Sequence, residues 1–157
     1  MIHFKIVTPE RVVLEKTITQ ATIPTAEGEI TILPNHRSYI GLLKPGEIVV
    51  KCIEEKDEDS QKREKKKEQD CALAVSGGFI EFVDNKLTIL ADTAERAEEL
   101  DLARAEEARK RAEELKKRKF VDDAQYALVA AQLEKELARI KVAKKWKKIV
   151  GETGKLK

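Results

Sequence analysis

The chain has 157 residues, of which 38% are charged, and its formal net charge is only +2 at pH 7. This length fits one domain, or a compact domain with an appendage, and no apolar run approaches the ~20 residues that cross a bilayer. So small a net charge excludes the broad positive field with which many proteins attract nucleic acid. The first residues show no basic-then-apolar export leader, so a cytoplasmic location is expected.

Residues 1–92 show the pattern of short strands. At the start of the chain Ile2, Phe4 and Ile6 alternate with other residues, as the two faces of a strand require. Turn signals then recur at Gly28, Pro34-Asn35, Pro45-Gly46 and Asp84-Asn85. Several short strands at such close spacing predict a β-sandwich or a barrel.

Residues 54–70 interrupt this pattern with a segment that has no apolar side chain. Such a segment cannot bury enough surface to offset the entropy lost on ordering. We therefore interpret it as a charged insertion, either a long solvated hairpin loop or a frayed helix. A basic binding patch is the alternative, although the acidic residues of the segment outnumber the basic ones.

Cys52 and Cys71 flank the charged insertion and are expected to face each other across paired strands. Two interpretations stand: a disulfide that closes a loop, or two small apolar strand residues in a reducing compartment. Neither these cysteines nor His3 and His36 have the ligand spacing of a zinc site. We therefore expect no metal.

Residues 93–157 change to a helical pattern, in which Asp101 is a plausible N-cap. The first helix has a predicted inner face of Leu102, Ala105, Ala108 or Arg109, Ala112 and Leu115. After a break, Asp122 and Asp123 are placed to cap a second helix. Its predicted inner face comprises Tyr126, Val129, Ala130, Leu133, Leu137 and Ile140. The predicted fold class is α+β, with an N-terminal β-sandwich followed by a C-terminal antiparallel two-helix hairpin.

The face of the first helix consists mostly of alanine. Burial of one CH₂ group stabilises by only ~0.8 kcal/mol, so an alanine seam gains little from the area that it buries. A hairpin held in this way is expected to detach and to change partners at modest cost.

The strand region contains the signatures ILPNH, LLKPG and VSGGF, followed by LADTAERAEELD and an alanine-rich helix. In this order and spacing they resemble the epsilon subunit of the rotary F-type ATP synthase, over the whole chain apart from the charged insertion. The resemblance implies a non-catalytic central-stalk subunit that binds the gamma subunit and the membrane ring of c subunits. It implies a peripheral location on the cytoplasmic face of the bacterial cell membrane. The sequence agrees in having no GxxxxGK[ST] phosphate loop.

The resemblance also implies what the subunit does within the complex. It couples proton-driven rotation to ATP synthesis on the alpha and beta subunits, and its two C-terminal helices inhibit ATP hydrolysis. It is expected to need no cofactor, with ATP as a regulatory ligand. On the sandwich, the c-ring side is expected near Glu29, Leu33, Pro34 and His36, and the gamma contact at Gly77, Gly78 and Phe79. The alternative for the two glycines is a plain β-bulge, and for His36 a hydrogen-bonded turn residue.

The stretch LDLARA matches an ATP-binding motif of the family. The implied site residues are Glu95, Leu100, Asp101, Arg104, Ala105, Arg111, Lys135 and Arg139. Asp101 and Arg104 share a helix face, and guanidinium groups suit phosphate oxygens because they donate in a planar fork. Lys135 stands where the family prefers arginine and cannot make that bidentate contact.

Alternatives remain open for this pair and for the basic C-terminal region. Asp101 and Arg104 are equally explained by an N-cap and an i,i+3 ion pair. The lysines of the region are expected to meet acidic segments of the beta subunits: Lys141, Lys144, Lys145, Lys147 and Lys148. Anionic lipid or nucleic acid is the alternative partner. A free-standing ATP-binding sensor and a helical-hairpin adaptor are the rival functions for the chain.

Overall fold

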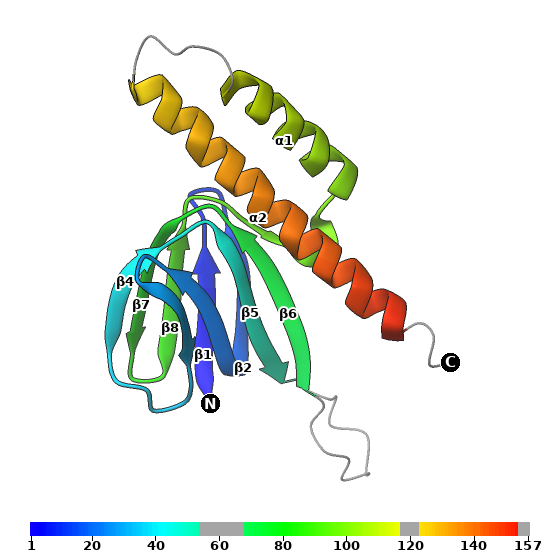
Figure 1. Cartoon of the computed structure of the whole chain (residues 1–157). Helices are drawn as coiled ribbons and strands as arrows, with labels where there is room; N and C mark the ends of the chain where they lie inside the picture. The colour runs from blue at the N-terminus through cyan, green and yellow to red at the C-terminus, as the bar shows by residue number, and fades with distance from the viewer. Residues whose placement is uncertain (54–67, 117–122, 154–157) are drawn as a thin grey trace.

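The computed structural model of the chain describes residues 1–53, 68–116 and 123–153. Figure 1 shows a β-sandwich with a two-helix hairpin at one end, which confirms the predicted fold class. The strands are β1 (Ile2–Val7), β2 (Val12–Thr25), β3 (Gly28–Ile32), β4 (Tyr39–Leu43), β5 (Gly46–Ile53), β6 (Glu68–Val75), β7 (Gly78–Val83), β8 (Lys86–Ala91) and β9 (Ala94–Arg96). They are followed by a 3₁₀ turn, η1 (Ala97–Glu99), and the helices α1 (Leu102–Lys116) and α2 (Asp123–Thr153).

The long strand β2 belongs to both layers of the sandwich. Its first half pairs antiparallel with β1, and its second half pairs with β3 and β5. On one side the hydrogen-bonded order runs from β1 through β8 and β7 to β4, and on the other from β2 through β5 and β6 to β9. Of these pairings, β1 with β8 is parallel and the others are antiparallel.

The core between the layers is built from the alternating residues of the strands. Ile2, Phe4 and Ile6 are fully buried, as the alternation in β1 predicts. The largest fully buried side chains also include Phe82, Ile18, Ile23, Ile32, Ile48, Leu73, Ile80, Leu87 and Ile89. The predicted tight turn joins β7 to β8, where Asp84 and Asn85 have φ angles of 49° and 60°. Positive φ at both central residues is the requirement of a type I′ hairpin turn.

Gly77 and Gly78 do not form a β-bulge, because the ladders of β7 with β4 and β8 run through Gly78 without a register shift. Gly77 lies in the connection from β6 to β7 and Gly78 is the first residue of β7, with φ angles of 142° and 131°. A Cβ atom on Gly78 would lie 2.0 Å from the carbonyl oxygen of Leu90. The close approach of the two strands therefore requires glycine at this position.

Two sequence boundaries differ from those predicted. The sheet continues beyond residue 92, because β9 pairs with β6 through Ala94, Glu95 and Arg96. Residues 68–70 of the predicted charged insertion belong to β6, where Gln69 pairs with Cys52. Backbone pairing needs no apolar side chain, so composition did not reveal this part of the strand. The remainder of the insertion lies outside the described residues.

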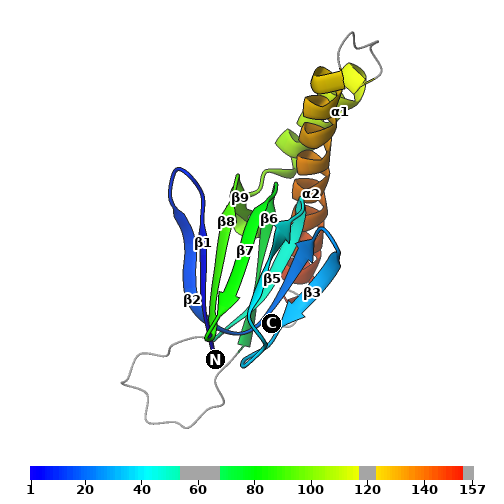
Figure 2. The same ribbon diagram turned by 90° about the vertical axis from the view of Figure 1, so that its left-hand side faces the viewer.

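The two helices pack against each other, and α2 continues onto the sandwich (Figures 1 and 2). Ala105 and Ala112 of α1 are buried, as the predicted alanine seam requires, whereas Leu115 at its end is exposed. The predicted inner face of α2 is wrong at Tyr126 and Leu137, which are exposed. Among the α2 residues whose burial the structure describes, the buried ones are Glu136, Ala138, Ile140, Val142 and Ala143, because this part of the helix faces both α1 and the sandwich.

A small apolar cluster holds α2 on the sandwich. It contains Ala74 of β6, Ala97 of η1 and Val142 of α2, with Leu100 and Trp146 packed against them. Ion pairs surround the cluster: Lys145 Nζ lies 3.0 Å from Glu47 Oε1 of β5, and Lys144 Nζ lies 3.2 Å from Glu106 Oε1 of α1. α2 therefore rests on the sandwich through a few apolar contacts and an ion pair of the exposed Lys145 with the nearly buried Glu47, and Lys144 joins it to α1.

Candidate functional site

A pocket of about 580 Å³ opens where β9, η1, α1 and α2 meet. The residues that line it are Glu95, Glu99, Leu100, Asp101, Arg104, Ala105, Glu107, Ala108, Arg111 and Arg139. The fold therefore brings together all the predicted nucleotide-site residues except Lys135. Lys135 is half-buried one turn before Arg139 on α2 and does not line the pocket.

Asp101 caps helix α1, as predicted. Its Oδ1 atom accepts hydrogen bonds from the backbone N–H groups of Ala103, at 2.9 Å, and Arg104, at 3.3 Å. These bonds satisfy two of the donors that the first turn of a helix leaves without partners. The predicted alternative of an ion pair between Asp101 and Arg104 is absent from the described part of the chain.

Arg104 is exposed at the rim of the pocket, one helical turn after the cap. Its guanidinium group makes no hydrogen bond or ion pair with any residue in the ranges that the structure describes. The neighbouring Arg111 is different, because it forms an ion pair with Glu107 of the preceding turn. Arg104 is therefore a guanidinium group in the pocket lining whose donors are available to an anion.

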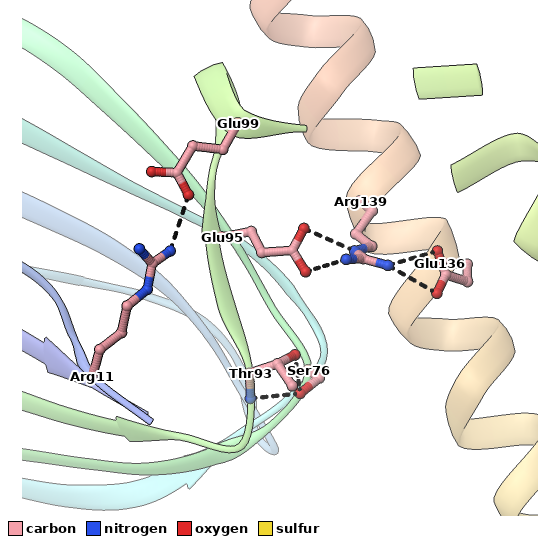
Figure 3. A network of polar contacts seen from close by, with 7 residues as sticks. All are labelled: Arg11, Ser76, Thr93, Glu95, Glu99, Glu136 and Arg139. Carbon is pink, nitrogen blue, oxygen red and sulfur yellow. Dashed lines mark hydrogen bonds and ion pairs between the residues drawn. The ribbon is translucent and has the colours of Figure 1, made fainter. Parts of the chain in front are cut away.

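Arg139 of α2 joins the helix to the sandwich through two carboxylates (Figure 3). Its Nε donates to Glu95 Oε2 of β9 at 3.1 Å, and its Nη2 donates to the other oxygen of Glu95. Its Nη1 donates to Glu136 Oε1 and Oε2 at 3.1 and 3.3 Å. Burial alone would lower the pKa of Arg139, but the hydrogen bonds and charges of Glu95 and Glu136 together raise that pKa.

Two acidic residues of this network were not among the predicted site residues. Glu136 is buried and stands three residues before its partner Arg139, a spacing that would have indicated the pair. Glu99 lines the pocket and accepts a hydrogen bond from Arg11 of the β1–β2 connection at 3.1 Å (Figure 3). The contact between Arg11 and Glu99 joins residues far apart in the sequence, so no local pattern could have revealed it.

A second feature is an apolar row on the outer face of β4, β7 and β8. Leu42 lies directly opposite Phe79, and Phe79 lies opposite Leu90. Their side chains are 55%, 59% and 55% exposed, and Ile40, two residues before Leu42, is 74% exposed. Side chains opposite each other on one face of a sheet are in contact distance, so these residues form one continuous apolar face. We call Ile40, Leu42, Phe79 and Leu90 the apolar face.

The other predicted contact residues of the sandwich differ in exposure. Glu29, Leu33 and His36 are exposed, and Pro34 is half-buried. His36 is a hydrogen-bonded turn residue, since its Nδ1 lies 2.8 Å from the Arg37 carbonyl oxygen. Gly77 is buried, so its backbone is not available as a packing surface, and the gamma contact predicted there rests on Phe79.

The fold and the pocket define a class of protein: a β-sandwich that carries a folded-back helical hairpin, with a polar pocket at their junction. No helix in the described ranges is both long and apolar enough to span a membrane.

The comparisons with known proteins identify the family. Residues 1–97 match the beta-sandwich domain of the ATP synthase delta/epsilon chain, and residues 98–144 match the long alpha-helix domain of the same chain. The chain belongs to this family of ATP synthase delta/epsilon chains. It is 40% identical to the ATP synthase epsilon chain of Chloroflexus aggregans, over 90% of this chain and 91% of the relative. The epsilon chain of Herpetosiphon aurantiacus is 39% identical, over 91% of this chain and 94% of the relative.

Solved structures share the fold at lower identity. A chain in the mitochondrial ATP synthase OSCP/F1/c-ring structure of Euglena gracilis matches with a TM-score of 0.64 and 23% identity, over 85% of this chain and 75% of that one. A chain of the Tetrahymena thermophila mitochondrial ATP synthase central stalk and c-ring matches with a TM-score of 0.62 and 14% identity, over 90% and 96%. Membership of this family explains the signatures ILPNH, LLKPG and VSGGF of the strand region. The two rival functions, a free-standing ATP-binding sensor and a helical-hairpin adaptor, leave these signatures unexplained.

Proposed function

We propose that this chain is the epsilon subunit of a bacterial F-type ATP synthase and acts as a non-catalytic rotor subunit of the central stalk. In this role it binds the gamma subunit and the c-subunit ring and couples proton-driven rotation to ATP synthesis on the alpha and beta subunits. It is then peripheral, on the cytoplasmic face of the cell membrane, and attached through the complex. Family membership and the names of the bacterial relatives support this proposal.

The apolar face is the observation that carries the rotor role. Large contiguous apolar patches on a soluble protein mark interaction sites, because exposing them to water is unfavourable. Phe79 stands at the centre of the row, between Leu42 and Leu90, where an aromatic anchor contributes most to binding. We assign this face to the gamma subunit, and the exposed Glu29, Leu33 and His36 to the c-ring side.

Phe79→Glu is expected to weaken binding to the gamma subunit by about 2 kcal/mol or more, roughly thirtyfold, because it places a charge in the middle of an apolar contact. The measurement is co-purification of the chain with gamma, followed by titration of the purified pair. Leu33→Glu is the matched control, since Leu33 is also an exposed apolar residue of the sandwich but is assigned to the c-ring side, which is absent from the purified pair. Equal binding by the Phe79 variant and the wild type would contradict the docking assignment.

The helical hairpin is the proposed inhibitory element. In the compact state described above, α2 rests on the sandwich through a small apolar cluster and a few ion pairs. In a proposed extended state, α2 leaves this seat, reaches along gamma and blocks hydrolysis at the catalytic subunits. The lysines near its C-terminus, including Lys144 and Lys145, then exchange their partners Glu106 and Glu47 for acidic segments of the beta subunits.

ATP is the proposed regulatory ligand of the pocket, since the uncommitted donors of Arg104 face a cavity that is large enough for a nucleotide. Arg104 and Arg111 are assigned to the phosphates, because the donors of Arg139 are already directed at Glu95 and Glu136. ATP that binds only the compact state would stabilise it by ~2.7 kcal/mol at a hundred times its dissociation constant. A high concentration of ATP would therefore favour the compact state and relieve the inhibition of ATP hydrolysis by the catalytic subunits.

Arg104→Ala is expected to reduce the affinity for ATP at least about tenfold, since a charge-assisted hydrogen bond to phosphate contributes about 1.5–3 kcal/mol. Isothermal calorimetry of the isolated chain with ATP and Mg²⁺ measures this change. Lys110→Ala is the matched control, because Lys110 is an exposed cation of the same helix that does not line the pocket. If neither the wild type nor the Lys110 variant released heat with ATP, the sensor role would be wrong while the rotor role would stand.

A further inference from the structure

The two cysteines meet inside the β5–β6 pair. Val50 lies opposite Cys71 and Cys52 lies opposite Gln69, so the cysteines are diagonal neighbours on one face of the ladder. That face points into the core, where Val50 is also buried. The two Sγ atoms are 2.8 Å apart and both thiols are free. Since a disulfide bond is about 2.05 Å long, a shift of under about 1 Å is enough to join the two sulfurs.

We propose that Cys52 and Cys71 form a reversible dithiol–disulfide site that reacts with low-molecular-weight disulfides of the glutathione class. This site is separate from the nucleotide pocket and from the apolar face, because neither cysteine belongs to either. It is also independent of whether the chain binds ATP.

The two thiols differ in the way that such an exchange requires. Cys71 is half-buried and accessible to a small oxidant, whereas Cys52 is only 2% exposed. The hydrogen bond with Cys52 lowers the pKa of the Cys71 thiol to about 7. The charges of Lys16 and Arg96 also lower this pKa, whereas burial and the charge of Glu98 raise it. The same hydrogen bond, together with burial, raises the pKa of Cys52. Since the thiolate is the nucleophile, Cys71 is the attacking group and Cys52 the resolving group.

The exchange proceeds in two steps that balance in atoms and electrons. The Cys71 thiolate attacks one sulfur of oxidised glutathione, which forms a mixed disulfide on Cys71 and releases one glutathione thiolate. Cys52 then loses its proton to solvent, attacks Sγ of Cys71 and releases the second glutathione. Two protein thiols are oxidised and one glutathione disulfide is reduced to two thiols.

The crosslink would join the two strands on which α2 rests. Glu47 of β5 holds Lys145, and Ala74 of β6 packs against Val142. The bond also closes a ring that contains residues 53–70, which reduces the entropy of the unfolded chain. We expect the oxidised protein to unfold about 5 °C or more above the reduced protein.

The test uses the full-length reduced chain incubated with oxidised glutathione, with free-thiol titration and intact-mass measurement. Both thiols should disappear, the mass should fall by two hydrogen atoms without a glutathione adduct, and dithiothreitol should restore both thiols. Peptide mapping without reductant should then recover the segments containing Cys52 and Cys71 as one linked fragment. A glutathione adduct that persists on the wild-type chain, with no internal bond, would overturn the proposal.

Single-cysteine variants assign the order of the two steps. Cys52→Ser should accumulate a stable glutathione adduct on Cys71, because no resolving thiol remains. Cys71→Ser should react at least tenfold more slowly, because Cys52 is buried. One outcome would overturn the proposal. If a concentration of oxidised glutathione that modifies the Cys52→Ser variant left the wild type with two free thiols, Cys52 would not attack the mixed disulfide on Cys71.

Discussion

Removal of the second helix, by truncation after Phe120, is expected to raise ATP hydrolysis by the assembled complex about tenfold while assembly stays intact. The sandwich contains the proposed docking surface and its own core, and neither includes residues of α2. If the extended state is favoured by about 1.4 kcal/mol, only about one complex in ten is active, and deletion of the blocking helix releases the rest. Steady-state hydrolysis of the reconstituted complex measures the change.

The control for this truncation is a chain that ends at Thr153, which keeps the whole of α2. This shorter truncation should leave hydrolysis close to that of the full-length complex. The Phe120 truncation should also abolish any dependence of inhibition on ATP concentration, since the two-state element is gone. Unchanged hydrolysis in a fully assembled complex would remove the inhibitory role and leave a passive rotor subunit.

Arg139→Ala is expected to release α2 from the sandwich. The Glu136 side chain is only 5% exposed and would lose the guanidinium group that holds it. Removal of one partner of a buried ion pair typically costs 3–5 kcal/mol, and the partial exposure of Arg139 reduces this to about 2 kcal/mol or more. Trp146 is the single tryptophan of the chain and packs against the cluster that seats α2. Its emission should therefore shift to longer wavelength, and denaturant titration should show an earlier loss of the helix contact.

Lys141→Ala is the matched control for this variant, because Lys141 is an exposed cation two residues further along the same helix. The double variant Arg139→Ala with Glu136→Ala should recover part of the loss, since no unpaired carboxylate remains buried. A Trp146 spectrum and a helix stability equal to those of the wild type would show that the Arg139 network does not hold the compact state. The helix would then rest on the apolar cluster and the Lys145–Glu47 ion pair.

The sequence allowed prediction of the features that depend on local pattern. Alternation in β1 predicted the burial of Ile2, Phe4 and Ile6, and Asp84 with Asn85 predicted the β7–β8 turn. The cap at Asp101 was also predictable, because an acidic side chain before a helical pattern satisfies free N–H groups. The class of fold was predictable because the apolar residues alternate in the strand region and recur at helical spacing after it. The family was predictable from the short signatures of the strand region.

Features that depend on contacts between distant segments were not predictable in the same way. Tyr126 and Leu137 have helical spacing but are exposed, because α2 divides its contacts between α1 and the sandwich. Arg139 was predicted as a nucleotide ligand, whereas in the structure its donors are directed at Glu95 and Glu136. Lys135 does not line the pocket, whereas Arg139 does. Which face of α2 points toward the pocket depends on how the helix packs, and helical spacing alone does not give this. Nucleotide binding by the remaining residues stays a prediction.

The passage of β2 through both layers has a mechanical consequence. Because one continuous strand is hydrogen-bonded to β1 on one side and to β5 on the other, the two layers cannot slide apart without breaking its backbone bonds. A torque applied at the surface around Phe79 would therefore reach the seat of α2 through a stiff body with little elastic loss. Such a body suits a part that turns against load, because its two layers share one hydrogen-bonded strand.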